Sequence, residues 1–193
     1  MNKIFLSSCF IVYLFLLFPY SITMASEEPQ YDVVHKTEIY EIRHYLDRLV
    51  VQAPFSSNRS DGSSFRKLFK YISGANNTSE EIKMTVPVTQ TKKDNEFFMQ
   101  FYLPSKFTKE TIPIPSNPDL EIATIKEGYF AVIKYSGRSS DKNFVKHSKI
   151  LYQKLLEDQI SIKGSAIKAT YNSPFTLPAF RRNEAMFNVD WKN

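Results

Sequence analysis

The sequence predicts an α+β protein built from two units with the same order of elements, strand–strand–helix–strand–strand. Segments with the strand period of two are interrupted twice by stretches with the helical period of 3.6. A connector at 104–118 that carries four prolines separates the first set from the second. Short connections within each unit favour antiparallel pairing. We therefore expect one domain at 27–193, with pseudo-repeats at about 38–103 and 119–190.

The first unit is preceded by a charged segment, 27–37, which we interpret as a leader to the fold. Residues 38–45 alternate in the manner of a strand, and a turn at 46–48 leads to a second strand at 49–54. Ser, Asn, Asp and Gly then supply a helix N-cap. The helix expected at 64–73 has an apolar stripe at i, i+3, i+4 and i+7, formed by Phe65, Leu68, Phe69 and Ile72.

Two strands complete the first unit, and the second unit repeats the order. Pro87 interrupts the strand expected at 82–91, which is typical of a bulge or a sheet edge. An apolar strand follows at 96–103. The second unit consists of strands at 121–125 and 129–135, a helix at 143–158, and strands at 168–171 and 184–189.

Composition excludes several function classes. The 193 residues carry a formal charge of +5 without a dense Lys/Arg run, which argues against nucleic acid as the main partner. The sequence has no zinc-type Cys/His cluster and no Gly-rich phosphate loop. Cys9 is the only cysteine, so a chain processed after residue 26 would have no thiolate chemistry and no cysteine ligand.

Residues 1–26 have the pattern of a cleaved signal peptide. Lys3 gives the positive start, residues 4–18 are apolar, and small residues at 23–25 suit cleavage after Ala25 or Ser26. We therefore expect a periplasmic or secreted protein of roughly 165 residues, enough for one sizeable core. The alternative is an uncleaved N-terminal membrane anchor, because 4–25 is about long enough to span a bilayer.

The stretch 171–189 organises the C-terminal part of the chain. Pro174 and Pro178 prevent it from starting as a helix or a central strand, so it predicts a rigid loop between two strands. Arg181 and Arg182 follow this apolar loop directly. A basic pair after a stiff apolar loop suits an anionic ligand with a flat apolar body, although a solvated charge cluster is the simpler alternative.

Three motifs in this sequence together resemble the SOUL haem-binding family. They are Y-N-x-P-x-T-x-P-x-x-R-R-N-E from Tyr171, Y-E-I-R-H-Y from Tyr40 and I-K-M-T-V-P-V from Ile82, and the resemblance covers about 31–191. Ala185 departs from the valine usual in the family. The resemblance implies an eight-stranded, distorted antiparallel β-barrel with two outer helices, and reversible, non-covalent binding of haem or another porphyrin.

Cations near apolar surface are the candidate ligand contacts. Haem is a flat apolar disc with two propionates, so a site needs an apolar wall rimmed by cations. Arg66, Lys67 and Lys70 flank the first helix, and Lys70 matches a Lys-Tyr of the family at this point. Arg181 and Arg182 would supply the opposite rim. The apolar stripe itself is expected to belong to the core, so that the ligand would touch the flank or an end of the helix.

His44 is the candidate haem-iron ligand, because it alone among the three histidines lies within a family motif and imidazole is a common axial ligand. The alternative is a strand histidine satisfied by hydrogen bonds or water. His35 and His147 are expected to be solvated.

The function indicated is non-enzymatic tetrapyrrole binding by a monomer that acts as carrier, buffer or scavenger, without stable membrane insertion once the signal is removed. One alternative is a small-molecule enzyme on the same barrel, with Glu41, Glu184 and Tyr171 as an acid/base set. We expect instead that Glu184 forms a structural ion pair with the neighbouring arginines. Another alternative is a protein-interaction module with incidental haem affinity.

Overall fold

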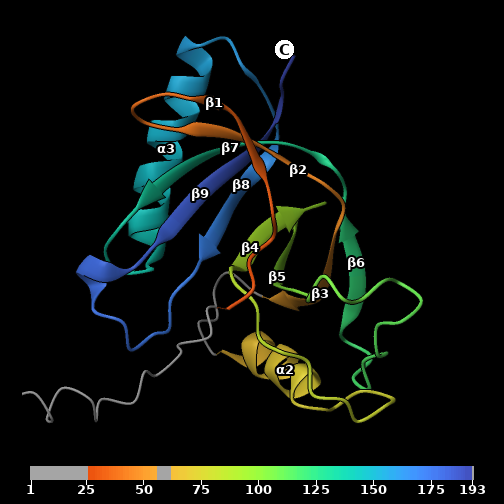
Figure 1. The fold of residues 1–193 in the computed structure, drawn as a ribbon. Helices are drawn as coiled ribbons and strands as arrows, with labels where there is room; N and C mark the ends of the chain where they lie inside the picture. Colours follow the sequence, from red (N-terminus) through yellow and green to blue (C-terminus); the bar gives the residue numbers. More distant parts are fainter. Residues whose placement is uncertain (1–25, 56–61, 193) are drawn as a thin grey trace, which may run out of the picture.

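The computed structural model describes residues 26–55 and 62–192. Within these ranges one sheet holds nine antiparallel strands in the order β1-β2-β7-β9-β8-β4-β5-β3-β6 (Figure 1). Two α-helices and one short 3-10 helix, η2, complete the secondary structure. The elements are β1 Asp32–Lys36, β2 Glu41–Tyr45, β3 Arg48–Phe55, α2 Ser63–Ile72, β4 Val88–Lys93, β5 Glu96–Tyr102, β6 Glu121–Ile125, β7 Gly128–Tyr135, α3 Asp141–Glu157, β8 Ser161–Thr170, η2 Pro178–Phe180 and β9 Asn183–Asp190.

The expected order of elements occurs twice, as β2-β3-α2-β4-β5 and β6-β7-α3-β8-β9. Once β1 is set aside, the strand order is symmetric about the β8–β4 pair, and each unit lends its first strand to the other. Thus β2 pairs with β7, and β6 pairs with β3. This exchange joins the two units into one sheet.

The expected eight-stranded closed barrel is corrected to an open nine-stranded sheet. A ninth strand, β1, forms in the segment predicted to be a leader and pairs with β2. The outer strands are β1 and β6, and the described residues contain no pairing between them. Each of these edge strands has five residues. Because β1 pairs with the edge of β2 that would otherwise be free, the two ends of the sheet remain separate.

Both helices pack on one face of the sheet. Leu151 and Leu155 of α3 are buried against alternate residues of β7 and β9, such as Ile133 and Phe187. Leu68 of α2 is buried against β3 and β5. The intervening residues of the same strands, which include Phe130 and Met186, form a third apolar cluster on the opposite face. We call this opposite face the inner face of the sheet.

The apolar stripe of α2 is divided between core and surface. Leu68, Tyr71 and Ile72 are buried, whereas Phe65 and Phe69 are 39% and 50% exposed. A ten-residue helix crossing the sheet buries only the side that faces β3 and β5, and Phe65 and Phe69 lie at the margin of that contact. The prediction that all four stripe residues belong to the core was therefore wrong for the two phenylalanines.

Two further boundaries differ from expectation. The strand expected at 82–91 begins only at Val88, after a cis Val86–Pro87 peptide bond. β8 is longer than expected and contains a register shift between Lys163 and Ile167.

Within the described part of the chain no helix is long and apolar enough to span a bilayer. The predicted signal segment lies outside that part, apart from Ser26.

Candidate functional site

A buried ion pair lies at the centre of the inner face. Arg43 of β2 and Glu184 of β9 each have fully buried side chains. Arg43 donates from Nη1 to Oε2 of Glu184 at 2.9 Å and from Nη2 to Oε1 at 3.0 Å. The Tyr171 hydroxyl also donates to Oε2 of Glu184, at 2.7 Å. The pair therefore has the bidentate geometry that makes Arg–carboxylate contacts strong.

Arg182 extends this network towards the N-terminal segment. It donates to Glu184 Oε1 at 2.8 Å and holds both carboxylate oxygens of Glu28 at 2.8 and 2.9 Å. Its guanidinium also stacks 3.7 Å from the centre of the Tyr171 ring. The prediction that Glu184 forms a structural ion pair is confirmed for Arg182.

Two members of this network have raised pKa values. Burial acts to lower the pKa of Arg43, but the hydrogen bonds from Arg43 to Glu184 and the charge of Glu184 outweigh burial and raise this pKa above its ordinary value. Burial, followed by the charge of Glu184, raises the pKa of Tyr171. Both carboxylate oxygens of Glu184 thus accept hydrogen bonds, from two guanidinium groups and a phenol.

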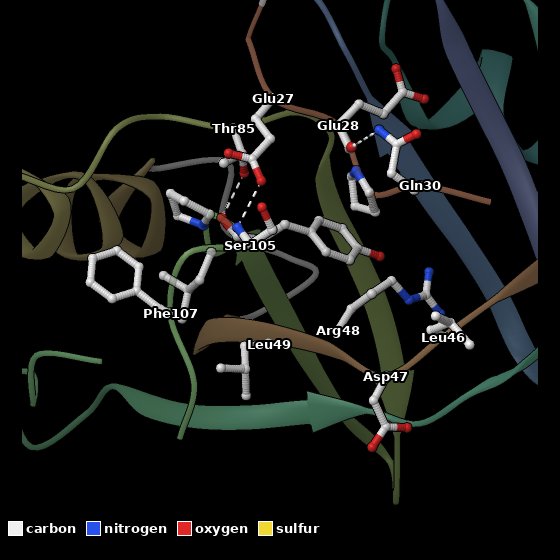
Figure 2. A pocket seen from close by; sticks show the side chains of 14 residues that line it. Glu27, Glu28, Gln30, Leu46, Asp47, Arg48, Leu49, Thr85, Ser105 and Phe107 are labelled. Atoms are coloured by element: carbon white, nitrogen blue, oxygen red, sulfur yellow. Dashed lines mark hydrogen bonds between the residues drawn. The ribbon is translucent and has the colours of Figure 1, made fainter. Parts of the chain in front are cut away.

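A cavity of about 430 Å³ opens beside this network, and Glu28 contributes to its lining. Figure 2 shows it between the N-terminal segment, the β2–β3 turn and the residues that follow β5. Glu27 tethers the N-terminal segment, because its Oε1 accepts from the Ser105 amide at 2.7 Å and its carbonyl accepts from the Val86 amide at 2.9 Å. The lining residues are Glu27, Glu28, Pro29, Gln30, Leu46, Asp47, Arg48, Leu49, Thr85, Tyr102, Leu103, Pro104, Ser105 and Phe107.

Arg48 is the cation of this cavity, and the sequence reasoning missed it by placing it in a turn. Arg48 is the first residue of β3, and its guanidinium stacks 4.1 Å from the centre of the Tyr45 ring and 4.8 Å from the centre of the Phe130 ring. Its Nε and Nη2 are buried and have no hydrogen-bond partner among the described residues. The sequence carried no local signal for this role, because the aromatic rings that contact Arg48 come from three different strands.

The predicted cations of α2 lie on its solvent side. Arg66 and Lys70 are exposed, and Lys67 forms an ion pair with Asp119 at 2.7 Å. Beside them the exposed rings of Phe65 and Phe69 stack with their planes 11° apart. The flank of α2 therefore exposes two aromatic rings beside the predicted cations, although the sequence placed these rings in the core.

Arg181 has a different role from Arg182. Its Nε donates to the Thr176 carbonyl at 2.7 Å, and its Nη2 donates to the Pro174 carbonyl, so it closes the loop before β9 on itself. That loop is strongly apolar at its surface, where Phe175 is 95% exposed and Phe180 is 77% exposed. The loop is held to the end of β7 by the Gly137 amide, which donates to the Pro178 carbonyl at 2.9 Å.

The structure does not join the two predicted rims by a contact. No hydrogen bond or ion pair between described residues connects α2 to the loop at 173–182, and the 430 Å³ cavity is lined by none of the predicted cations. Arg182 is committed to Glu28 and Glu184. Haem contact by Arg66, Lys67, Lys70, Arg181 and Arg182 stays a prediction.

His44 lies on β2, which pairs with β7, and its side chain is partly buried. Its Nε2 is 2.9 Å from Oε1 of Glu127, and its ring packs 4.9 Å from that of Tyr129. The expectation that the other histidines are solvated was wrong. His35 packs against Trp191, and His147 stacks on Tyr135 with ring centres 4.0 Å apart.

Comparison with solved structures shows which proteins share this fold. The C-terminal domain of EcmrR matches with a TM-score of 0.59 at 14% identity, over 83% of this chain and 98% of that domain. A hydrolase from Listeria innocua matches with a TM-score of 0.56 at 11% identity, over 81% of this chain and 94% of that one. An uncharacterized conserved protein from Listeria innocua matches with a TM-score of 0.52 at 10% identity, over 86% and 94%. At these identities the likeness concerns the fold alone.

Comparison with curated proteins finds no match. The model of the family described as SOUL heme-binding protein matches residues 26–188, which is most of the chain and includes all nine strands except the end of β9. The chain therefore belongs to the SOUL heme-binding protein family.

Proposed function

We propose that this protein binds haem or another tetrapyrrole reversibly, without covalent attachment and without catalysis, as a carrier, buffer or scavenger. The observation that supports this most directly is the flank of α2, where the stacked rings of Phe65 and Phe69 are exposed beside Arg66 and Lys70. This flank fits the group chemically, since a porphyrin face can cover the rings while its propionates meet the cations.

The magnitude of this contact can be estimated from exposure. Fully burying a Phe side chain contributes about 1.5–3 kcal/mol. Phe65 and Phe69 have 39% and 50% of their surface still exposed. Covering both rings therefore contributes about 1–3 kcal/mol, or roughly 10-fold to 100-fold in affinity. Each exposed charge-assisted contact adds about 1 kcal/mol or less.

The loop before β9 is the second apolar surface in this proposal. Phe175, Leu177 and Phe180 are all exposed there, and Arg181 holds the loop in one shape through two backbone carbonyls. Such a rigid surface contacts a ligand without first having to be ordered. In the proposed complex, Lys70 and Arg181 lie at opposite edges of the porphyrin.

Hemin titration of variants tests the apolar contact. Replacing Phe65 and Phe69 together by Ser is expected to weaken hemin binding about tenfold or more, because the porphyrin loses both rings. Leu156→Ser is the matched control, since Leu156 is 56% exposed on α3. Unchanged hemin affinity in a folded double variant would remove α2 from the site.

A second pair of variants tests the cations. Changing Lys70 and Arg181 together to Glu is expected to weaken hemin binding at least tenfold without unfolding the protein, because two attractive charges become repulsive. Changing Lys146 and Lys149 together to Glu is the matched control, since both lysines are exposed on α3. Unchanged hemin affinity in a folded Lys70→Glu/Arg181→Glu variant would discard the cation rim.

Iron ligation by His44 stays a separate prediction. Nε2 of His44 is engaged with Glu127, so that contact must break if Nε2 is to bind iron. If His44 is the axial ligand, His44→Ala abolishes any shifted Soret band. An identical spectrum for the variant removes His44 from the haem site.

A protein-interaction module is the second candidate, and the exposed Phe175, Leu177 and Phe180 favour it. A stable partner whose binding is lost on Phe175→Ser, with hemin affinity unchanged, would support this alternative. The hydrolase label of one structural neighbour does not favour an enzyme here, because Glu184 is fully paired.

We also propose that the protein acts in the periplasm or outside the cell. The pattern of residues 1–26 supports this, with a positive start, an apolar run and small residues before the cleavage point. Intact mass of protein purified from its own host is expected to correspond to a chain that begins at Ser26 or Glu27. Retention of residues 1–25 would favour the membrane-anchored alternative.

A further inference from the structure

The 430 Å³ cavity has the construction of a binding site independent of the haem surface proposed above. Its volume lies within the range of about 300–1,000 Å³ that is usual for ligand pockets. Leu46, Leu49, Leu103, Pro104 and Phe107 supply apolar walls. Figure 2 shows Glu27 and Ser105 towards one side and Arg48 and Leu46 towards the other. It is therefore an apolar hollow with one arginine in its wall.

Arg48 is charged and lacks a counter-ion. No described carboxylate forms an ion pair with it, and its buried Nε and Nη2 donate to no described acceptor. Its contacts are the rings of Tyr45, Phe130 and, at 5.8 Å, Tyr102. Stacking on aromatic faces offsets only part of the cost of removing a guanidinium from water. An anion in the adjoining cavity would provide the missing counter-ion, while Nε and Nη2 stay enclosed against the aromatic rings.

The carboxylates that also line the cavity are occupied by other groups. Glu28 is held by Arg182 through both oxygens. Asp47 accepts from the Lys126 ammonium at 2.9 Å and from the Glu127 amide at 2.7 Å. Glu27 accepts from the neutral Ser105 amide at 2.7 Å and lies towards the side of the cavity opposite Arg48 (Figure 2). Since Glu28 and Asp47 have cationic partners and Glu27 lies on the other side, Arg48 is the group placed to select the charge of a ligand.

We propose that this cavity binds the carboxylate of a small amphipathic monocarboxylic acid, with Arg48 as the counter-ion and the leucine, proline and phenylalanine side chains enclosing the apolar tail. Guanidinium and carboxylate form charge-assisted hydrogen bonds, and the apolar walls favour a hydrocarbon or aryl body over a second charge. The site is distinct from the flank of α2, whose cations do not line the cavity.

Isothermal titration of the full chain with octanoate tests this site, with octanamide and octylamine as probes of the same length. Octanoate is expected to bind at one site and about tenfold or more tighter than either probe, because only octanoate carries the charge that Arg48 selects. Octylamine binding as tightly as octanoate would overturn the assignment of an anion site, as would the absence of saturable octanoate binding at millimolar ligand.

Three variants locate the site. Arg48→Met keeps an unbranched apolar stem and removes the charge, and it is expected to weaken octanoate binding about tenfold or more, whereas Arg48→Lys weakens it less. Ser105→Trp fills the cavity from an exposed position and leaves Arg48 in place. It is expected to abolish octanoate binding, which keeps the test decisive if Arg48→Met does not fold. Unchanged binding in folded Arg48→Met or Ser105→Trp refutes the proposal.

Arg66→Met is the control that separates this inference from the haem proposal. Arg66 is exposed on α2 and does not line the cavity. Octanoate binding should be unchanged in Arg66→Met, and hemin binding should be unchanged in Arg48→Met. If octanoate affinity instead depends on Arg66 or on Phe65 and Phe69, octanoate binds at the α2 flank and the cavity site is refuted. Loss of hemin binding alone would affect only the haem proposal.

Discussion

Glu184→Ala tests the buried network on which the inner face depends. The substitution leaves the Arg43 guanidinium fully buried without its bidentate partner. Breaking a buried pair by removing one member costs about 3–5 kcal/mol. Arg43 keeps weaker partners, because Glu41 lies 3.4 Å from Nη2 and the Tyr45 hydroxyl 3.1 Å from Nη1. We therefore expect a loss near the lower limit, about 3 kcal/mol.

The lost Tyr171 contact adds to this figure, whereas Arg182 adds little. Tyr171 loses its acceptor, a neutral-to-charged hydrogen bond worth about 1.5–3 kcal/mol before water replaces it. Arg182 retains Glu28 at 2.8 and 2.9 Å and so stays paired. With a total stability of about 5–15 kcal/mol for a typical domain, the variant should still fold. The effect should be read from the midpoint and slope of a chemical denaturation curve.

Matched variants separate charge from packing. Glu184→Gln keeps the volume of the side chain and removes its charge, so it should lose most of the stability that Glu184→Ala loses. Lys67→Ala breaks an exposed pair with Asp119 and should cost less than about 1 kcal/mol. A folded Glu184→Ala variant that loses no more stability than Lys67→Ala would refute the inference that a buried charge is left unpaired.

Two further predictions concern stability. Burial acts to raise the pKa of Glu41, but Lys134 and Arg43 outweigh it and hold this pKa below its usual value of 4.5. A lowered folded-state pKa contributes stability that is fully present above pH 4.5 and is lost as the pH falls through and below that value. Glu41→Gln should therefore make the free energy of unfolding fall less steeply with decreasing pH in this acid range. An unchanged acid dependence would contradict this. Leu151 is fully buried, so Leu151→Ala should lower the free energy of unfolding by about 2–5 kcal/mol, measured with denaturant. Leu156 is exposed, so Leu156→Ala should lower it by well under about 1 kcal/mol. Equal losses would contradict the packing of α3.

Most of the secondary structure was predictable because it follows from local patterns. Both helices and the strands at 121–125 and 128–135 lie within about two residues of the predicted bounds. β1 was missed because an exposed edge strand shows no apolar alternation, and it forms only by pairing with β2. The open sheet was not predictable either, since a local pattern does not show which strands become edges.

The candidate site was likewise predictable only in part. The basic flank of α2 and the apolar loop before β9 were identifiable, because helical spacing and proline chemistry place residues without reference to distant parts of the chain. The division of the α2 stripe was not, because only the position of the helix on β3 and β5 decides which rings are covered. Arg48 was missed for a related reason, since its aromatic partners come from β2, β5 and β7.

Local patterns were enough to predict the two strand–strand–helix–strand–strand units, the family and the residue types available to a ligand. Tertiary structure alone decided that β2 and β6 are exchanged between units and that Arg43 meets Glu184 across 141 residues. It also brought Glu28 to Arg182 across 154 residues and left Nε and Nη2 of Arg48 without a hydrogen-bond partner among the residues that the structure describes. The physical reason is that burial and pairing of a charge depend on which strands become neighbours, and local periodicity contains no information on neighbours distant in sequence.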